Sequence, residues 1–221
     1  WITVFVTLVG FAFATLIGLV LALMGLSRSL VLRQVSRFYV EIIRGVPILV
    51  LLFYIAFVGA PGFVLAWNWL TLPLQEAGLV DALRVRDISL MWRAIISLTI
   101  GYSAFIAEVF RAGILSVDEG QIEAAEALGL SRFQRFRFIV MPQALLGNDF
   151  VAMVKDSSLV SVLGVADLTQ MGKVYASGSF RFFETYSIVA YIYLLLTVGL
   201  SLALRAFERR LRKAGNNGGH G

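Results

Sequence analysis

Six ionisable side chains interrupt the long apolar segments of this sequence, and they are its strongest candidates for chemistry. They are Glu41, Arg44, Glu108, Arg111, Lys155 and Asp156. A charged group is costly inside a hydrocarbon layer, so each must pair with a partner, reach the membrane surface or face water. These side chains therefore indicate ion pairs within helices, a polar network between helices or a polar pathway.

Four of these residues form two predicted ion pairs, Glu41 with Arg44 and Glu108 with Arg111. Side chains three residues apart lie on one face of a helix, where opposite charges attract. Both pairs are near the ends of predicted helices, where long side chains can reach the membrane surface. We interpret both pairs as structural, and the alternative is a gate at the inner mouth of a pathway.

The other two residues begin a polar run, which is Lys155, Asp156, Ser157 and Ser158. The run starts about eleven residues into the predicted span 144–165, roughly 17 Å from its start and near mid-membrane. Such groups must face protein or water. Two interpretations stay open on this evidence: the wall of a translocation pathway, and a polar network between helices.

Several other kinds of chemistry lack the residues that they need. The chain has no cysteine, and its one histidine, His220, lies in a Gly- and Asn-rich tail, so thiol chemistry and His-based metal sites are unsupported. The ATP-binding pattern Gly-x-x-x-x-Gly-Lys-[Ser/Thr] is also missing, because Gly172 and Lys173 are followed by Val174. We predict a chain that is not an enzyme, binds no metal or cofactor and leaves ATP binding to another chain.

The elements that position these residues are predicted to be helices that span a lipid bilayer. With 59% hydrophobic and 15% charged residues, the chain is too apolar for a soluble domain. Five segments reach the length of about 20 residues that one crossing needs, and they are residues 2–26, 38–59, 91–117, 144–165 and 186–206. A further apolar segment, 63–72, is too short and predicts an interfacial or re-entrant piece. The sequence thus predicts an all-α membrane protein with one domain over residues 1–213 and a disordered tail over 214–221.

The basic residues predict how these helices are oriented. Most of the 19 Lys and Arg residues fall in the first loop, the third loop and the C-terminal segment, and a side rich in such residues is normally cytoplasmic. The N-terminus is therefore predicted outside and the C-terminus in the cytoplasm. Because topology explains the net charge of +5, nucleic-acid binding is not implied.

Small residues recur at every fourth position of the first predicted span, at Gly10, Ala14, Gly18 and Ala22. Such a stripe lets a second helix approach closely. We interpret it as packing within this chain, and a contact with another subunit is the alternative.

The predicted cytoplasmic loop 118–142 carries a spaced motif. It consists of Glu123, Ala124 and Ala125, then Gly129, then a segment that ends at Pro142. The Ala- and Glu-rich stretch predicts a short helix, and Gly129 is placed to end it in a left-handed cap. A second short helix is predicted from Ser131, with Gln134 completing a capping box.

The second short helix predicts an exposed apolar ridge. Phe133, Phe136 and Val140 share one face at three- and four-residue spacing. Such a ridge can be buried by another protein, or it can rest on its own helix bundle. We favour docking of another protein, because the ridge and the motif occur together on the predicted cytoplasmic side.

The spacing of this motif resembles the EAA motif of ABC importer permeases. Three other stretches are similar to the polar amino acid branch of that family, and they are Tyr39 to Pro47, Ser103 to Ile114 and Lys155 to Leu159. The resemblance covers residues 1–213 and implies a type I ABC importer permease fold with five transmembrane helices. It also implies coupling to the ATPase through Glu123, Ala124, Ala125, Gly129, Phe133, Phe136 and Pro142.

The resemblance further implies the partners of the chain. Two permease subunits, identical or paralogous, would pair with a dimer of cytoplasmic ATPases that bind ATP and Mg. An extracytoplasmic binding protein would deliver polar amino acids, and the complex would lie in a bacterial inner membrane. Closure of the ATPases would move loop 118–142 and rock the spans between outward- and inward-open states.

Three rival functions remain to be weighed against this one. A permease for another class of small solute is the nearest rival. A self-sufficient secondary transporter, with the mid-membrane charges as a proton relay, is disfavoured because such carriers usually duplicate their helices within one chain. An intramembrane enzyme is disfavoured because the spans lack histidine, cysteine and a paired-Asp motif.

Overall fold

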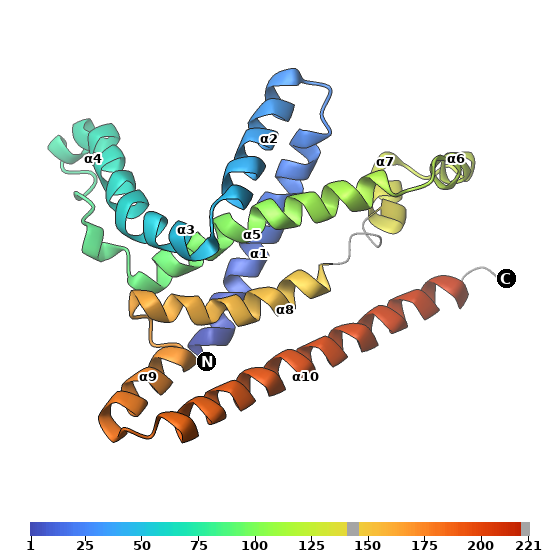
Figure 1. Cartoon of the computed structure of the whole chain (residues 1–221). Coiled ribbons are helices and arrows are strands. Elements are labelled where there is room, and N and C mark those ends of the chain that lie inside the picture. The colour runs from blue at the N-terminus through green and yellow to red at the C-terminus, as the bar shows by residue number, and fades with distance from the viewer. Residues whose placement is uncertain (141–145, 218–221) are drawn as a thin grey trace.

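The computed structural model describes residues 1–140 and 146–217, and its regular elements are helices (Figure 1). The α-helices are α1 (Ile2–Gly25), α2 (Leu30–Gly45), α3 (Ile48–Tyr54), α4 (Ala60–Glu76), α5 (Leu90–Leu115), α6 (Glu119–Ala127), α7 (Arg132–Arg135), α8 (Gly147–Asp156), α9 (Leu168–Ser179) and α10 (Phe182–Asn217). Two π-helical turns, η1 (Ile55–Gly59) and η3 (Phe136–Val140), and two 3₁₀ segments, η2 (Val85–Asp87) and η5 (Ser157–Leu163), connect them. The predicted all-α class is confirmed.

Four helices of the described residues are long and apolar enough to cross a membrane. They are Ile2–Gly25, Ile48–Glu76, Leu90–Leu115 and Phe182–Ala206. The predicted span 144–165 corresponds instead to α8 followed by η5, two shorter helices in succession, and residues 144 and 145 lie outside the described residues. At the C-terminus, α10 runs on to Asn217, four residues into the predicted tail 214–221, and residues 218–221 lie outside the described part of the chain.

The boundaries of the second predicted span, 38–59, differ from those of the structure. Helix α2 ends at Gly45, Val46 is extended, and a new helix begins at Ile48. Proline has no N–H and forces the residue before it away from helical geometry, so Pro47 breaks the helix. The apolar segment 63–72, expected to be a short separate piece, is the second half of the 29-residue helix that starts at Ile48.

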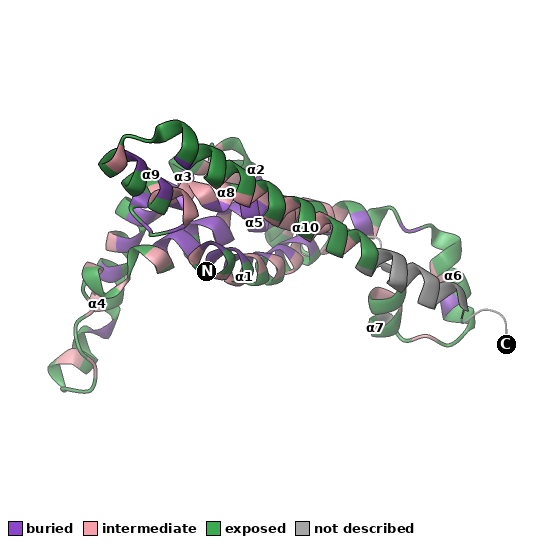
Figure 2. Ribbon diagram, turned by 90° about the horizontal axis from the view of Figure 1, so that it is seen from below, coloured by how far each residue is buried: buried purple, intermediate pink, exposed green. Residues whose placement is uncertain are grey.

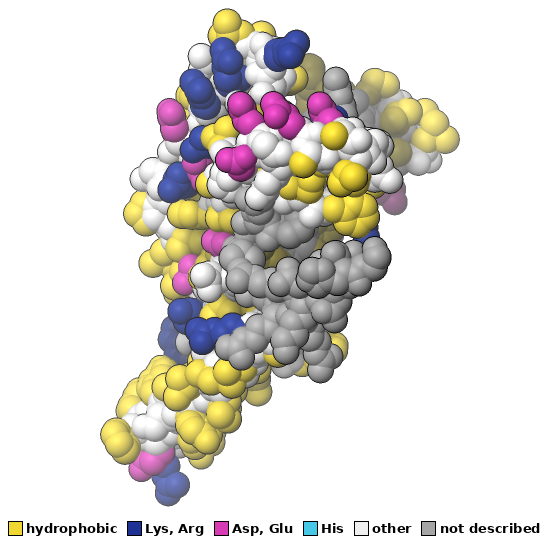
Figure 3. Space-filling view, turned by 90° about the vertical axis from the view of Figure 1, so that its right-hand side faces the viewer, with side chains coloured by type: hydrophobic (Ala, Val, Ile, Leu, Met, Phe, Trp, Pro, Cys, Tyr) yellow, Lys and Arg dark blue, Asp and Glu magenta, His cyan; other side chains and the backbone are white. Residues whose placement is uncertain are grey.

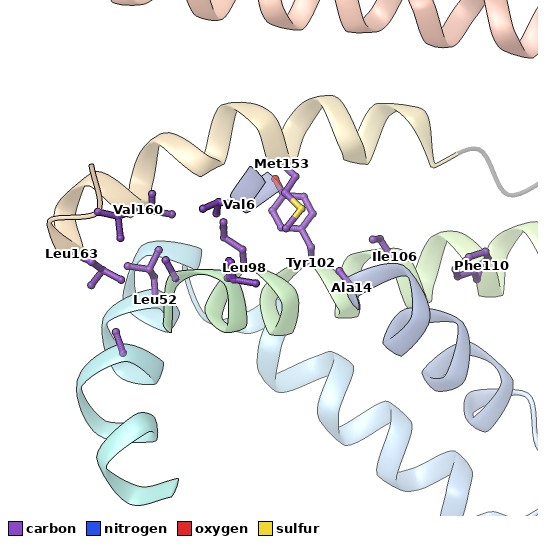
Figure 4. Packing of buried hydrophobic residues seen from close by; sticks show 14 of the residues in the cluster. Val6, Ala14, Leu52, Leu98, Tyr102, Ile106, Phe110, Met153, Val160 and Leu163 are labelled. Carbon is purple, nitrogen blue, oxygen red and sulfur yellow. The ribbon is translucent and has the colours of Figure 1, made fainter. Parts of the chain in front are cut away.

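The core lies where α1 crosses α5 (Figure 4). Val6, Leu98 and Ile106 are fully buried there, and Met153 of α8 closes one side. The small-residue stripe of α1 is buried along this contact. A Cβ atom at Gly18 would lie 2.8 Å from Ile106 Cγ2 and 3.0 Å from the Ser103 carbonyl oxygen. The predicted use of the stripe within this chain is confirmed.

A buried arginine joins three elements at the opposite end of the bundle from α6. Arg93 is 8% exposed, and its guanidinium donates to the carbonyl oxygens of Ala56 at 3.3 Å and Ile88 at 2.9 Å and also to that of Val85. Buried backbone carbonyls outside regular helix need such partners. Arg93 therefore fixes the π-turn η1 and the segment before α5 to the start of α5.

A buried carboxylate fixes the last two helices. Asp167 caps α9 by accepting from the backbone N–H groups of Thr169 and Gln170, at 3.1 and 2.9 Å. The hydroxyl of Tyr193 on α10 donates to the same carboxylate at 3.2 Å. The N–H of Leu168 donates to the Thr3 hydroxyl at 3.1 Å, so α1, α9 and α10 meet at this cap.

We predict that Gly18→Val lowers the thermal unfolding temperature of the purified chain in detergent. The added side chain collides with α5 backbone and side-chain atoms, and such overpacking costs about 1–3 kcal/mol. Gly199→Ala is the matched control, because no atom lies within 4 Å of a Cβ at that position. Equal unfolding temperatures for Gly18→Val and the unsubstituted chain would contradict the close contact of α1 with α5.

Candidate functional site

The segment after α5 forms a short helical hairpin made of α6 and α7. Asp118 begins α6, and its side chain accepts from the Gly120 N–H at 2.8 Å. At the other end Gly129 has φ of 75°, and the N–H groups of Gly129 and Leu130 donate to the carbonyls of Glu126 and Ala125 at 2.9 and 3.0 Å. This bonding pattern is a Schellman cap, so the predicted left-handed cap at Gly129 is confirmed.

The turn into α7 is fixed by side chains as well as by backbone. The Ser131 N–H donates to the Gln134 side-chain oxygen at 2.8 Å, and the Gln134 N–H donates to the Ser131 hydroxyl at 3.3 Å. This is the predicted capping box. An ion pair between Arg135 and Glu126 joins α7 back to α6, so the two helices are held at a fixed angle.

The hairpin lies beyond the C-terminal end of α5, at the edge of the molecule (Figure 1). Figure 3 views this end, where acidic side chains gather over the hairpin. Asp118, Glu119, Glu123 and Glu126 are all exposed, whereas Ala125 is buried inside the hairpin. Helix α6 with its cap therefore presents a mainly acidic surface, and Ala125 is its buried residue.

The apolar ridge of the hairpin differs from the predicted one. Phe133 is 71% exposed, as expected, but Phe136 is only half-buried and Phe138 is 61% exposed. The reason is the π-turn η3, which begins at Phe136 and has more residues per turn than the α-helix assumed for the ridge. Phe133 and Phe138 are thus the exposed aromatic side chains of the second arm, while Pro142 and the side chain of Val140 lie outside the described part.

The polar run at the end of α8 is divided by the structure. Lys155 is exposed, Asp156 and Ser158 are half-buried, and Ser157 is fully buried with its hydroxyl bonded to the Val154 carbonyl at 2.7 Å. The Tyr102 hydroxyl of α5 donates to Asp156 Oδ2 at 2.7 Å. Asp156 is therefore held in one position, whereas the Lys155 side chain points out of this subunit.

The remaining charged side chains all line one cavity. Its volume is about 540 Å³, and it lies between α1, α2 and α5. Glu108 and Arg111 form the predicted ion pair, with two carboxylate contacts to Arg111 Nε at 3.1 and 3.2 Å and one to Nη2 at 2.8 Å. Such a bidentate pair is stronger than a single contact.

The second predicted pair is not formed within the described residues. Glu41 and Arg44 both line the cavity and are exposed, but the Arg44 guanidinium lies over the Phe105 ring, 5.5 Å from its centre. This cation–π contact ties α2 to α5. The cavity is therefore lined by one neutralised pair and by three further charged side chains, Arg37, Glu41 and Arg44, of which Glu41 and Arg44 do not pair with each other.

Comparison with known proteins decides the family. Residues 14–213 match the family model described as "Binding-protein-dependent transport system inner membrane component". The chain belongs to this family. It is the membrane-spanning permease subunit of an ABC transporter, as its sequence predicted, and it is a protein of the inner membrane.

Curated relatives match this permease along most of their length. The "Probable amino-acid permease protein YxeN" of Bacillus subtilis (strain 168) is 38% identical in an alignment that covers 96% of this chain and 89% of that protein. The "Glutamine transport system permease protein GlnP" of Escherichia coli (strain K12) is 35% identical in an alignment that covers 95% of this chain and 90% of that protein.

Solved structures match the fold. A crystal structure of an amino acid ABC transporter with histidines has a TM-score of 0.72 and 36% identity, and the match covers 94% of this chain and 90% of that one. An inward-facing conformation of the MetNI methionine ABC transporter has a TM-score of 0.67 at 23% identity, which supports the fold alone. The permease thus has the chain fold of ABC transporter membrane subunits.

Sequence reasoning missed three residues of the permease: two touch predicted site residues, and the third replaces one of them. Tyr102 holds Asp156, Phe105 lies under Arg44, and Phe138 takes the exposed position expected of Phe136. Tyr102 could have been singled out from the sequence, because a tyrosine hydroxyl inside an apolar helix needs a hydrogen-bond partner. The positions of Phe105 and Phe138 depend on helix crossing and on a π-turn, and neither can be read from residue spacing.

Proposed function

We propose that this permease forms the path by which polar amino acids cross the inner membrane, and that the α6–α7 hairpin couples this path to a separate cytoplasmic ATPase. The observation that supports the coupling is the hairpin itself, which is capped at both helices, closed by an ion pair and placed beyond the bundle. The relatives named for amino-acid and glutamine transport and the amino acid ABC transporter structure support the substrate class.

The proposed topology has five crossings. They are made by α1, by the segment 38–59, in which Pro47 separates the end of α2 from α3 and η1, by α5, by α8 with η5, and by α10. The basic loops support an orientation with the hairpin and the C-terminus in the cytoplasm and the N-terminus outside. In this orientation Arg93 and Asp167 lie toward the outer face, and the charged cavity lies toward the inner face.

This topology predicts which introduced cysteines an impermeant thiol reagent can reach. A cysteine-free chain accepts single reporters, and Ser89 and Ser131 are exposed positions next to α5 and α7. Ser89→Cys is expected to react in intact cells, and Ser131→Cys only after the membrane is opened. Labelling of Ser131→Cys in intact cells would overturn both the orientation and the cytoplasmic place of the hairpin.

In the proposed complex, two permease subunits contact a dimer of ATPases that bind ATP and Mg, and an extracytoplasmic binding protein delivers the substrate. The acidic surface of α6 favours an ATPase groove that carries basic side chains. Glu123 and Ala124 face outward and Phe133 and Phe138 add exposed apolar surface. A rigid element is needed here, because a flexible loop would absorb the motion that it has to transmit.

The coupling role predicts that Gly129→Val abolishes uptake while the permease still reaches the membrane. A β-branched residue at positive φ costs about 1–2 kcal/mol, so the two arms of the hairpin change their angle. Gly129→Asn is the matched control, because asparagine tolerates this conformation. Phe133→Ala is expected to weaken docking more mildly, through loss of about 2–3 kcal/mol of apolar burial.

The measurement is uptake and ATP hydrolysis stimulated by loaded binding protein, with permease, ATPase and binding protein reconstituted in lipid. Normal values for both Gly129→Val and Phe133→Ala would show that the hairpin does not transmit the signal. Loss of uptake in Gly129→Asn as well would mean that the glycine acts through something other than its backbone conformation.

The path is proposed to pass the polar run of α8. A zwitterionic substrate needs groups of both signs, and Lys155 and Asp156 supply them side by side, with Tyr102 holding the carboxylate in place. The exposed Lys155 side chain supports a wall that faces a space between subunits rather than a closed network within one subunit.

If the path is correct, Asp156→Asn accumulates normally in the membrane but raises the KM for uptake by about tenfold or more. The asparagine side chain keeps an oxygen that accepts from the Tyr102 hydroxyl, and it loses only the negative charge of the carboxylate. A hydrogen bond between a charged group and the substrate is worth about 1.5–3 kcal/mol. Lys155→Met is expected to change substrate selectivity in the same assay. A lower unfolding temperature with unchanged KM in Asp156→Asn would instead support the polar network between helices.

A further inference from the structure

Helix α4 projects from the bundle as an arm. It follows α3 and η1 as one helical run from Ile48 to Glu76, turns away from α5, and is largely exposed along its length (Figures 1 and 2). Arg93 holds the base of this arm through the Ala56 and Val85 carbonyls. The arm is therefore a fixed feature of the fold whose surface lacks a protein cover within the described residues.

The polar side chains of the arm are turned to one side and bonded there. Asn68 exchanges two hydrogen bonds with the backbone of Leu83, at 2.8 and 2.9 Å. Gln75 donates to the Thr71 hydroxyl at 2.7 Å, and that hydroxyl donates to the Trp67 carbonyl at 2.7 Å. The segment that returns to α5 thus covers the polar side of α4.

The rest of the circumference of α4, away from its polar side, is apolar and exposed. At roughly 100° per residue, the exposed apolar side chains span about 220° of the helix. They are Phe63, Leu65, Trp67, Trp69, Leu70, Leu72 and Leu74. A helix that rests on one protein partner needs a stripe only ≳100° wide, whereas a helix that is apolar over most of its circumference is surrounded.

The distribution of charged residues along the helical run also indicates that α4 is surrounded by an apolar medium. No charged residue occurs from Ile48 to Gln75, and charges resume at Glu76 and in the returning segment, at Asp81 and Arg84. The run of 29 residues is about 43 Å long, which exceeds a hydrocarbon core of about 30 Å. The apolar surface of α4 is therefore continuous with that of a membrane-spanning segment but too long to lie wholly along the same crossing.

We propose that α4 lies in the lipid leaflet opposite the α6–α7 hairpin, surrounded by phospholipid acyl chains, with its charged tip at the head groups. Trp67 and Trp69 suit this place, because tryptophan is enriched at the boundary between chains and head groups. The arm widens the footprint of the permease in that leaflet, and it is not a docking surface for a water-soluble binding protein. This position of α4 in the lipid depends neither on which substrate is carried nor on how the ATPase docks.

The test is fluorescence quenching of the arm tryptophans in the reconstituted permease. The chain has four tryptophans, so Trp1→Phe with Trp92→Phe leaves Trp67 and Trp69 as the only tryptophans of this chain. The emission of the variant that lacks all four, measured with the same subunits, is subtracted as background. The protein, with any subunits that co-purify, is reconstituted in vesicles of phosphatidylcholine brominated either near the head group or near the chain end. Aqueous iodide is the second quencher.

The expected result is strong loss of emission with bromine near the head group, weaker loss near the chain end and little loss with iodide. Strong iodide quenching without bromolipid quenching would overturn the proposal in favour of a water-exposed docking surface. Protection from both quenchers would overturn it in favour of a contact with a second permease. If the double variant accumulates poorly, the difference in emission between the unsubstituted chain and Trp67→Phe with Trp69→Phe gives the same comparison.

Discussion

A polar group inside a hydrocarbon layer must find its partner within the protein, because lipid offers none. This constraint fixes much of the permease. Arg93 gives its donors to carbonyls of η1, η2 and the segment before α5. Asp167 uses its carboxylate to cap α9 and to hold Tyr193. Each of these groups joins segments that are distant in sequence, so satisfying a polar group also sets how helices are placed.

The hydrophobic effect does not drive helices together in lipid, so close packing stabilises their contacts instead. Helix α5 is the most buried of the candidate spans, and α1 reaches it through Gly10, Ala14 and Gly18. The Thr99 hydroxyl adds a hydrogen bond to the Gly10 carbonyl at 3.3 Å across this contact. Because small residues let the two backbones approach there, the relative position of α1 and α5 is strongly determined.

Sequence reasoning succeeded where a feature depends on neighbouring residues. The left-handed cap at Gly129 and the capping box at Ser131 are local, and the structure has both. The break at Pro47 is equally local, and the apolar pattern of 38–59 wrongly outweighed it. The position of Arg44 is a different case, because its spacing from Glu41 favours an ion pair and only the crossing of α2 with α5 brings Phe105 under the guanidinium. Tertiary contacts of this kind lie beyond residue spacing.

In the proposed mechanism α5 links the two functional regions. Its C-terminal end runs through Ser116 and Val117 into the hairpin, and Val117 is buried, so the joint is not loose. Tyr102, about 20 Å back from Leu115 along the same helix at roughly 1.5 Å per residue, bonds to Asp156. Between them lie the bidentate Glu108–Arg111 pair and the Arg44 contact, which tie the inner half of the helix to itself and to α2. A displacement of the hairpin would therefore be delivered to Asp156 by a packed, continuous helix.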